Sequence, residues 1–188
     1  MNRLRQFWRY AAKVFDLPCR LRAVRDRRAD PRVPTWAVTA TLFLGALLRK
    51  PSFLQIQFES RRQGWQHLTG YGEPITDDRL AYVCERYQLA DLRSVLVATN
   101  QTLKRNKAFE SAKIHGLLVV ALDANEQFKS RHRCCADCGE RRIQITNAQG
   151  QIEEVIEYYH RQVYAQIHGP DFSAVLHSAQ TPPLMDSW

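Results

Sequence analysis

Two neighbouring groups of residues in the middle of the chain carry side chains that bind metal ions. The apolar run GLLVVAL, residues 116–122, ends at Asp123, and Glu126 follows three positions later. A carboxylate held rigidly at a strand end suits Mg²⁺, and paired metal ions activate and stabilise the oxygens of a phosphodiester. Strand ends also carry Asp for turn formation, and Glu126 either joins such a site or faces water. The residue types alone leave both interpretations of this acidic pair open.

The second group is a cysteine cluster. Cys135 and Cys138 form a C-x-x-C pair, a spacing with which two thiolates bind one zinc ion. The residues that could complete a tetrahedral site are His132, Cys134 and His160. The alternative is a loop of reduced thiols and a strand histidine without a metal. A redox role fits less well, because a redox C-x-x-C normally begins a helix after a strand.

Nearly all of the net charge of +8 lies at the N-terminus. Residues 1–32 contain ten Lys or Arg and three Asp, which leaves a net charge of +7 there. Clustered arginines gain affinity for DNA by displacing counterions from its phosphates. The candidate DNA contacts are Arg3, Arg5, Arg9, Lys13, Arg25, Arg27 and Arg28. A solvated basic helix without a ligand, or a helix on a membrane surface, would explain the same charge.

The composition indicates a folded protein of the cytoplasm. Of the 188 residues, 45% are hydrophobic and 24% are charged. Three of the five cysteines crowd into residues 134–138, unlike the spaced framework of a small secreted domain. The first arginines precede no apolar h-region, so we expect no signal peptide. The most apolar segment, residues 36–48, is shorter than the roughly twenty residues that cross a bilayer, so we expect a buried helix and no membrane partner.

The periodicity of the apolar residues changes near residue 113. Before this point helical spacing predicts helices near residues 3–15, 35–50, 52–62, 77–87 and 89–107, the second with Thr35 as its N-cap. After it, short apolar or alternating runs predict strands at residues 117–122, 141–146, 155–168 and 172–177. The first of these strands is continuously apolar, which is typical of a strand buried on both faces. We therefore expect an α+β fold with a helical N-terminal region.

Five features follow one another in a telling order. They are KPSFLQIQFE, KRNKAF, LLVVALDANEQFKS, the cysteine cluster with arginines behind it, and EYYHRQVYAQIHG. Together they resemble the DDE transposases of bacterial insertion sequences, over about residues 34–175 and most strongly from Leu117 to Gly169. The resemblance implies a ribonuclease-H-like mixed sheet whose first strand ends in the first Asp of an Asp-Asp-Glu triad that binds two Mg²⁺ ions. Asp123 is the matching residue.

The resemblance also implies DNA cleavage at the transposon ends, strand transfer to target DNA and association with the nucleoid. The expected regions are residues 1–33 (basic helix and connector), 34–112 (recognition of DNA ends and assembly), 113–177 (partial catalytic region) and 178–188 (a tail outside the family pattern). The later Asp and Glu of the triad have no counterpart in this sequence, so we expect a truncated, inactive fragment of an incomplete sheet that retains at most DNA binding. Its open sheet edge favours self-association. The alternative is a small zinc-stabilised DNA-binding protein that regulates or inhibits transposition.

Overall fold

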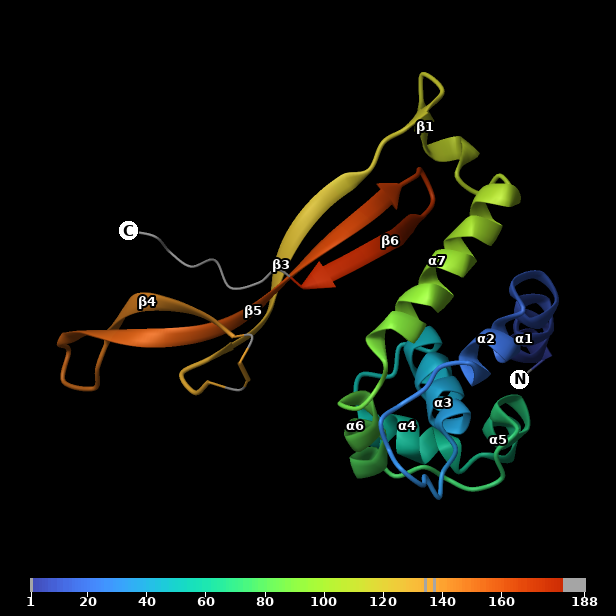
Figure 1. Ribbon diagram of the computed structural model, residues 1–188, viewed down its shortest axis with the longest axis horizontal. Helices are drawn as coiled ribbons and strands as arrows, with labels where there is room; N and C mark the ends of the chain where they lie inside the picture. Colours follow the sequence, from blue (N-terminus) through green and yellow to red (C-terminus); the bar gives the residue numbers. More distant parts are fainter. Residues whose placement is uncertain (1, 134, 137, 181–188) are drawn as a thin grey trace. The chain divides into compact units, whose positions relative to one another are not determined.

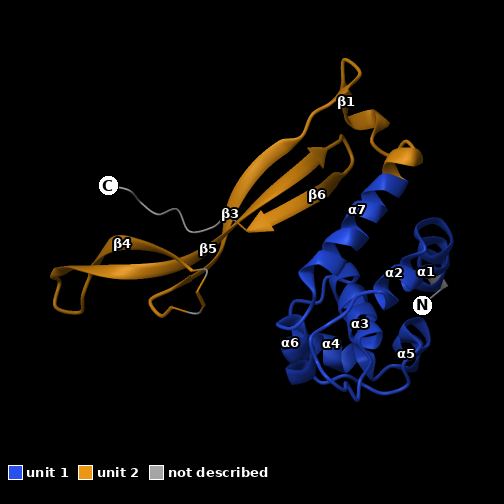
Figure 2. Ribbon diagram, viewed as in Figure 1, with its two compact units in different colours: residues 1–102 blue, residues 103–188 orange. Residues whose placement is uncertain are grey.

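The computed structural model describes residues 2–133, 135–136 and 138–180 and divides into two compact units (Figures 1 and 2). Unit 1 comprises residues 1–102 and unit 2 comprises residues 103–188. Unit 1 is helical, whereas unit 2 consists mainly of antiparallel strands, so the chain is α+β. The boundary falls inside a helix rather than after residue 112.

The described residues form seven α-helices. They are α1 (Asn2–Phe15), α2 (Leu17–Arg22), α3 (Thr35–Leu47), α4 (Phe53–Ser60), α5 (Gln63–Thr69), α6 (Asp77–Cys84) and α7 (Leu89–Arg105). Helical spacing predicted five of them. The exceptions, α2 and α5, have six and seven residues, which is too short to display a clear period. The helix α7 continues across the boundary between the two units.

Helix α3 is apolar on nearly all faces because it packs against α2, α4, α5 and α6. Gly45 allows α4 to approach closely, since a Cβ at this position would collide with the side chain of Ile56. The predicted N-cap was wrong by one residue: Pro34 occupies that position. The Thr35 hydroxyl instead donates a hydrogen bond to Asp26, 2.8 Å away. The core of unit 1 includes Val24, Val33, Val38, Leu44, Ile56, Ile75, Leu80 and Val83.

Unit 2 begins with a single 3₁₀ turn and a small hairpin. The turn is η1 (Glu110–Ala112), and the hairpin pairs β1 (Lys113–Ile114) with β2 (Leu117–Leu118). The remaining strands are β3 (Ala121–Ser130), β4 (Gly139–Thr146), β5 (Ile152–His168) and β6 (Ser173–Gln180). These four form one sheet, and every pairing among them is antiparallel. The relationship to a ribonuclease-H-like fold, whose complete sheet is mixed, stays a prediction.

The long strand β5 organises this sheet (Figure 1). Tyr159 pairs with β3 and also with β4, so these two strands lie on opposite edges of β5. Gln162 likewise pairs with β3 and with β6. Strands β4 and β6 must therefore follow one another along the same edge of β5. The β4 ladder ends at Tyr159 and the β6 ladder begins at Gln162, so the two strands meet beside His160.

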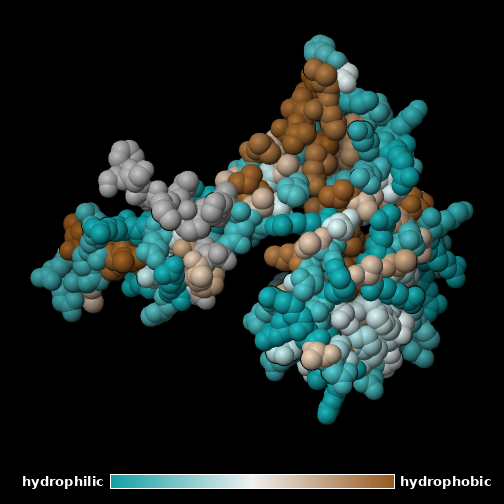
Figure 3. Space-filling model, viewed as in Figure 1, coloured by the Kyte–Doolittle hydropathy of each residue, from teal (hydrophilic) through white to brown (hydrophobic). Residues whose placement is uncertain are grey.

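The apolar run at residues 116–122 is not a strand buried on both faces, contrary to the prediction. Leu117 is 71% exposed and Leu122 is 74% exposed, and the run is divided between β2, a connection and β3. An apolar run is buried only where a second layer covers it, and the described part of unit 2 has a core cluster of just three buried residues, Phe109, Ala112 and Ile167. Apolar atoms consequently gather on the surface of this unit (Figure 3).

Candidate metal centre and nucleic-acid groove

Asp123 lies inside β3 rather than at its end. It is the third residue of that strand, its side chain is exposed, and it stands opposite Tyr164 of β5. Among the residues that the structure describes, Asp123 belongs to no group of three His, Cys, Asp or Glu ligand atoms close enough to hold a metal ion. A Mg²⁺ site at Asp123 therefore rests on the family resemblance alone.

Glu126 is engaged with cations of the sheet. Its carboxylate accepts hydrogen bonds from Arg141 at 2.8 and 3.1 Å and from Arg161 at 3.3 Å, and it pairs with Lys129 at 3.2 Å. These partners, Arg141 first and then Lys129, lower the pKa of Glu126 from 4.5 to about 2. The guanidinium groups of Arg141 and Arg161 also lie over the Tyr159 ring, 5.2 and 5.3 Å from its centroid. These ion pairs thus balance the charge of the Glu126 carboxylate without a metal ion.

Three of the predicted zinc ligands come together. The Sγ atoms of Cys135 and Cys138 lie 3.3 and 3.2 Å from Nε2 of His160 and 3.9 Å from each other. This Cys₂His set is a group that could hold a metal ion. His132 is not a member of it, and Cys134 lies outside the described residues.

The sheet determines where each of these ligands lies. Cys138 is buried directly before β4, and its backbone N–H donates to the carbonyl of Cys135 at 3.4 Å, which folds the two thiols towards each other. Gly139 then lets β4 approach β5, since a Cβ there would lie 2.7 Å from Tyr159 Cζ. His160 projects from the middle of β5, and its ring meets Phe128 edge to face at 5.9 Å.

A residue outside the Cys₂His group contacts its histidine. The side-chain amide of Gln180, the last residue of β6, lies 2.9 Å from Nδ1 of His160. Metal-bound histidines usually use their second ring nitrogen in this way, and the contact fixes both the tautomer and the ring orientation. Sequence reasoning missed Gln180, because nothing in its neighbourhood indicates proximity to residue 160.

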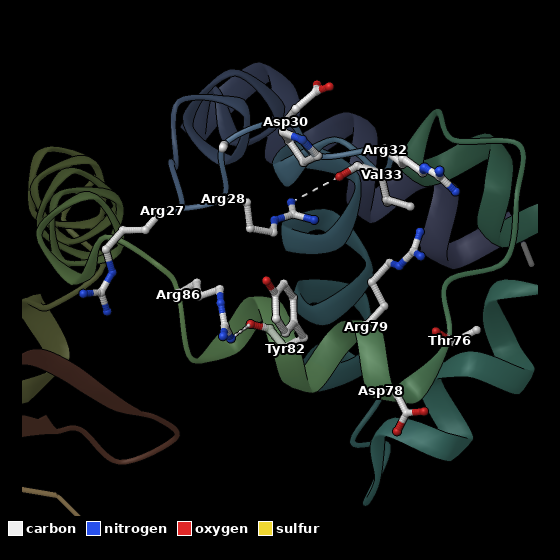
Figure 4. A pocket seen from close by; sticks show the side chains of 12 residues that line it. Arg27, Arg28, Asp30, Arg32, Val33, Thr76, Asp78, Arg79, Tyr82 and Arg86 are labelled. Carbon is white, nitrogen blue, oxygen red and sulfur yellow. Dashed lines mark hydrogen bonds between the residues drawn. The ribbon is translucent and has the colours of Figure 1, made fainter.

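A groove of about 610 Å³ in unit 1 is lined by arginines (Figure 4). It lies between the connector that precedes α3 and one face of α6. The basic residues around it are Arg27, Arg28, Arg32, Arg79 and Arg86. Asp30 and Asp78 also border the groove, but their carboxylates point away from the guanidinium of Arg79. The five arginines and two aspartates of the lining leave it a formal net charge of +3.

Arg28 and Arg86 are held in place by their neighbours. Arg28 bonds to Asp26 at 2.7 Å and to the carbonyl of Val33 at 3.1 Å. Burial raises the pKa of Asp26, but hydrogen bonds from Arg28 and Thr35 outweigh it, and the pKa is lowered overall. The guanidinium of Arg86 stacks on the Tyr82 ring, 3.6 Å from its centroid. Arg28 is thus a structural residue. Arg86 also pairs with the exposed carboxylate of Glu85 at 3.0 Å and is still partly accessible.

Arg27, Arg32 and Arg79 are the more exposed cations of the groove. The side chain of Arg27 makes one long hydrogen bond, to the Glu85 carbonyl at 3.4 Å. The side chains of Arg32 and Arg79 form no hydrogen bond or ion pair with any described residue. Sequence reasoning did not select Arg32, Arg79 or Arg86, although Arg79, Tyr82 and Arg86 have the spacing of one helical face.

The other predicted basic residues are less concentrated. On α1, Arg3, Arg5, Arg9 and Lys13 are exposed, and Arg5 and Arg9 border a separate hollow beside Trp8. Arg25 is engaged with Asp91 at 2.9 and 3.0 Å, and this hydrogen bonding raises the pKa of Arg25. Arg25 is therefore a weaker candidate for phosphate binding than the groove residues.

No helix in the described part of the chain is both long enough and apolar enough to cross a bilayer. The most apolar helix, α3, has 13 residues. In comparisons with known proteins, the chain matches no protein-family model, no curated protein and no solved structure. Its function must therefore be inferred from its own residues and their geometry.

Proposed function

We propose that this chain is a DNA-binding protein related to the N-terminal part of an insertion-sequence transposase, and that unit 1 binds the DNA backbone in the arginine groove. The observation that carries the proposal is that Arg27, Arg32, Arg79 and Arg86 all line one hollow. The order of the sequence features from residue 34 to 175 supports the family, and a ribonuclease-H-like origin of unit 2 belongs to the same proposal.

Arginine suits this task because its planar guanidinium bonds two phosphate oxygens at once. Stacking on Tyr82 holds Arg86 in one orientation, so less freedom is lost when it binds. Contacts of this kind position a protein on DNA and supply affinity, whereas sequence is read by contacts to base edges. The groove therefore accounts for affinity, and the exposed basic residues of α1 extend the same surface chemistry.

The salt dependence of binding measures the contribution of the groove. Each neutralised phosphate contributes about −0.9 to the slope of log K against log salt concentration, so four arginines predict a contribution of about −3.6. Replacing Arg32 and Arg79 by Ala should reduce the size of the slope by about 1.8.

The test is fluorescence anisotropy with a short labelled duplex, titrated with the full chain between about 50 and 200 mM salt. The matched control is Arg93→Ala with Lys104→Ala, which removes the same charge from exposed positions on α7. The proposal predicts a large loss for the Arg32/Arg79 variant and a small one for the control. Equal losses would mean that net charge, and not the groove, determines binding.

In this proposal Asp123 corresponds to the first metal ligand of the transposase, but the chain by itself does not cleave DNA. Phosphodiester cleavage by this family requires several converging carboxylates, and the described residues supply no such group around Asp123. The residues do not fit a Mg²⁺ centre. We expect no Mg²⁺-dependent cleavage by the purified chain, and Asp123→Ala should leave DNA binding unchanged.

We propose in addition that the Cys₂His group of unit 2 binds Zn²⁺, which also suits a zinc-stabilised regulator of transposition. Zn–S bonds of about 2.3 Å and Zn–N bonds of about 2.0 Å in a tetrahedron separate two sulfurs by about 3.8 Å and a sulfur from a nitrogen by about 3.5 Å. In the structure the sulfurs lie 3.9 Å apart, and each lies 3.2 or 3.3 Å from the nitrogen. Thiolate and imidazole also exclude Mg²⁺, which prefers oxygen ligands.

Metal analysis of the purified chain tests this second proposal. We expect one zinc ion per chain, and a cobalt-substituted protein with the absorption of a tetrahedral thiolate complex. Cys138→Ser should abolish both signals. Cys84→Ser is the matched control, because Cys84 lies on α6 in unit 1.

A further inference from the structure

We infer that zinc bound to Cys135, Cys138 and His160 joins the two halves of the sheet in unit 2, and that Gln180 positions the histidine for it. This inference rests on the zinc proposal above. It assigns the metal a role in assembly of the sheet, and it assigns an outer contact to a residue far from the C-x-x-C pair in sequence.

The inference starts from the junction between β4 and β6. Both strands lie along one edge of β5, and their ladders end at Tyr159 and Gln162, so strand pairing does not join β4 directly to β6. His160 projects from β5 at this junction. A metal ion bound to His160 therefore lies at the gap between β4 and β6 along this edge of β5.

The ligands reach the junction from different segments. Cys135 and Cys138 belong to the connection that leads from β3 into β4, and His160 belongs to β5. Gln180 brings in the end of β6 through its contact with the His160 ring. One ion thus ties the start of β4 and the end of β6 to the middle of β5.

The small core explains why unit 2 needs such a link. Its buried cluster of Phe109, Ala112 and Ile167 includes β6 residues at its margin, but none from β4. On the β4 side of β5, Ile152 is 72% exposed and Ile156 is 45% exposed. Small domains that bury little apolar surface commonly depend on a metal or on disulfides for their stability. Metal binding to such a unit contributes directly to its folding free energy.

Gln180 selects the tautomer that can bind the metal. When Nε2 of His160 binds zinc, the ring proton must reside on Nδ1, 2.9 Å from the Gln180 amide. The amide oxygen of Gln180 accepts this proton once the amide is turned so that its oxygen faces the ring. A glutamate could accept the same proton, whereas a leucine could not. This difference separates positioning from simple packing.

The experiment uses the full chain, first stripped with a chelator and then titrated with Zn²⁺. Hydrogen exchange is measured for the peptides of β4, β6 and, as an internal reference, α3. We expect zinc to slow exchange at the start of β4 and at the end of β6 together, and to leave α3 unchanged. We expect Gln180→Leu to weaken zinc binding about 10- to 100-fold, and Gln180→Glu to retain most of it. Gln151→Leu, at an exposed turn, is the matched control.

Each outcome decides one point. If the chain binds no zinc, both the zinc proposal and this inference are wrong. If zinc binds without protecting both β4 and β6, the zinc proposal stands and the joining role is overturned. If Gln180→Leu binds zinc as tightly as the unmodified chain, or if Gln180→Glu fails like Gln180→Leu, Gln180 does not position His160.

Discussion

The pairing of Asp26 with Arg28 supports the wall of the arginine groove, and removing the carboxylate should destabilise unit 1 severely. Asp26 accepts hydrogen bonds from the Arg28 guanidinium at 2.7 and 2.9 Å, from the Arg28 backbone at 2.9 Å and from Thr35 at 2.8 Å. The two side chains are only 1% and 9% exposed. In Asp26→Ala, Arg28 keeps its charge and its burial but loses its counterion.

Breaking a buried ion pair from one side costs about 3–5 kcal/mol, because the remaining charge is left uncompensated. Asp91→Ala is the matched control, since its partner Arg25 is 77% exposed, and exposed pairs contribute about 0–1 kcal/mol. The double variant Asp26→Ala with Arg28→Ala should recover about 1–3 kcal/mol relative to additive losses, because it also removes the stranded charge.

The assay is urea unfolding followed by tryptophan fluorescence, since Trp8, Trp36 and Trp65 all lie in unit 1. The expected order of stability is wild type, Asp91→Ala and then Asp26→Ala, and the double variant should lose less stability than the sum of its two single variants. Equal losses for Asp26→Ala and Asp91→Ala would refute the argument from burial. Strict additivity in the double variant would show that Asp26 and Arg28 do not act as a pair.

Two further predictions concern the core of unit 1 and the sheet of unit 2. Leu44 is fully buried, so Leu44→Ala should cost about 2–5 kcal/mol in urea unfolding, whereas Leu54→Ala, at a half-exposed position, should cost under about 1 kcal/mol. Because the pKa of Glu126 is lowered from 4.5 to about 2, its ion pairs stabilise unit 2 fully above about pH 4.5, and this contribution is lost as the pH falls through about 2. Thermal melting monitored by circular dichroism should show a smaller acid-induced loss in Glu126→Gln, and an unchanged pH dependence would contradict the assignment.

A helix was predictable from the sequence where its apolar residues form one stripe, or where nearly all of its residues are apolar, over many positions. Helix α1 follows its apolar stripe, and α4 begins after the Ser52 side chain, which accepts a hydrogen bond from the backbone of Gln55 at 3.3 Å. The strands β4, β5 and β6 also follow their sequence patterns. The prediction of a buried strand at residues 116–122 was wrong, because an apolar run is buried only if other elements cover it. Both β4 and β6 pair with the same edge of β5. This arrangement is a tertiary property that no local sequence pattern contains.

The candidate sites were predictable to different extents. The C-x-x-C spacing selected Cys135 and Cys138, and His160 was one of three suggested partners that spacing could not rank. Folding brings His160, in the middle of β5, to the start of β4, whereas His132 does not join the group and Cys134 lies outside the described residues. The groove shows the reverse. The density of charge at the N-terminus predicted Arg27 and Arg28, which line one side of the groove. Arg79 and Arg86, on and beside α6, line the other side, and only the folded structure brings them near the first pair.

The position of Asp123 inside β3 has a consequence that is independent of catalysis. In the described part of the chain β3 pairs only with β5, so its outer edge presents unsatisfied backbone N–H and C=O groups. Such an edge is a template on which a second extended chain can grow. The bulge at Glu126–Phe128 disturbs the second half of this template. In the first half the flanking residues Leu122 and Ala124 are apolar, and Asp123 supplies the charge that opposes aggregation. Loss of catalytic function would therefore not make this aspartate dispensable.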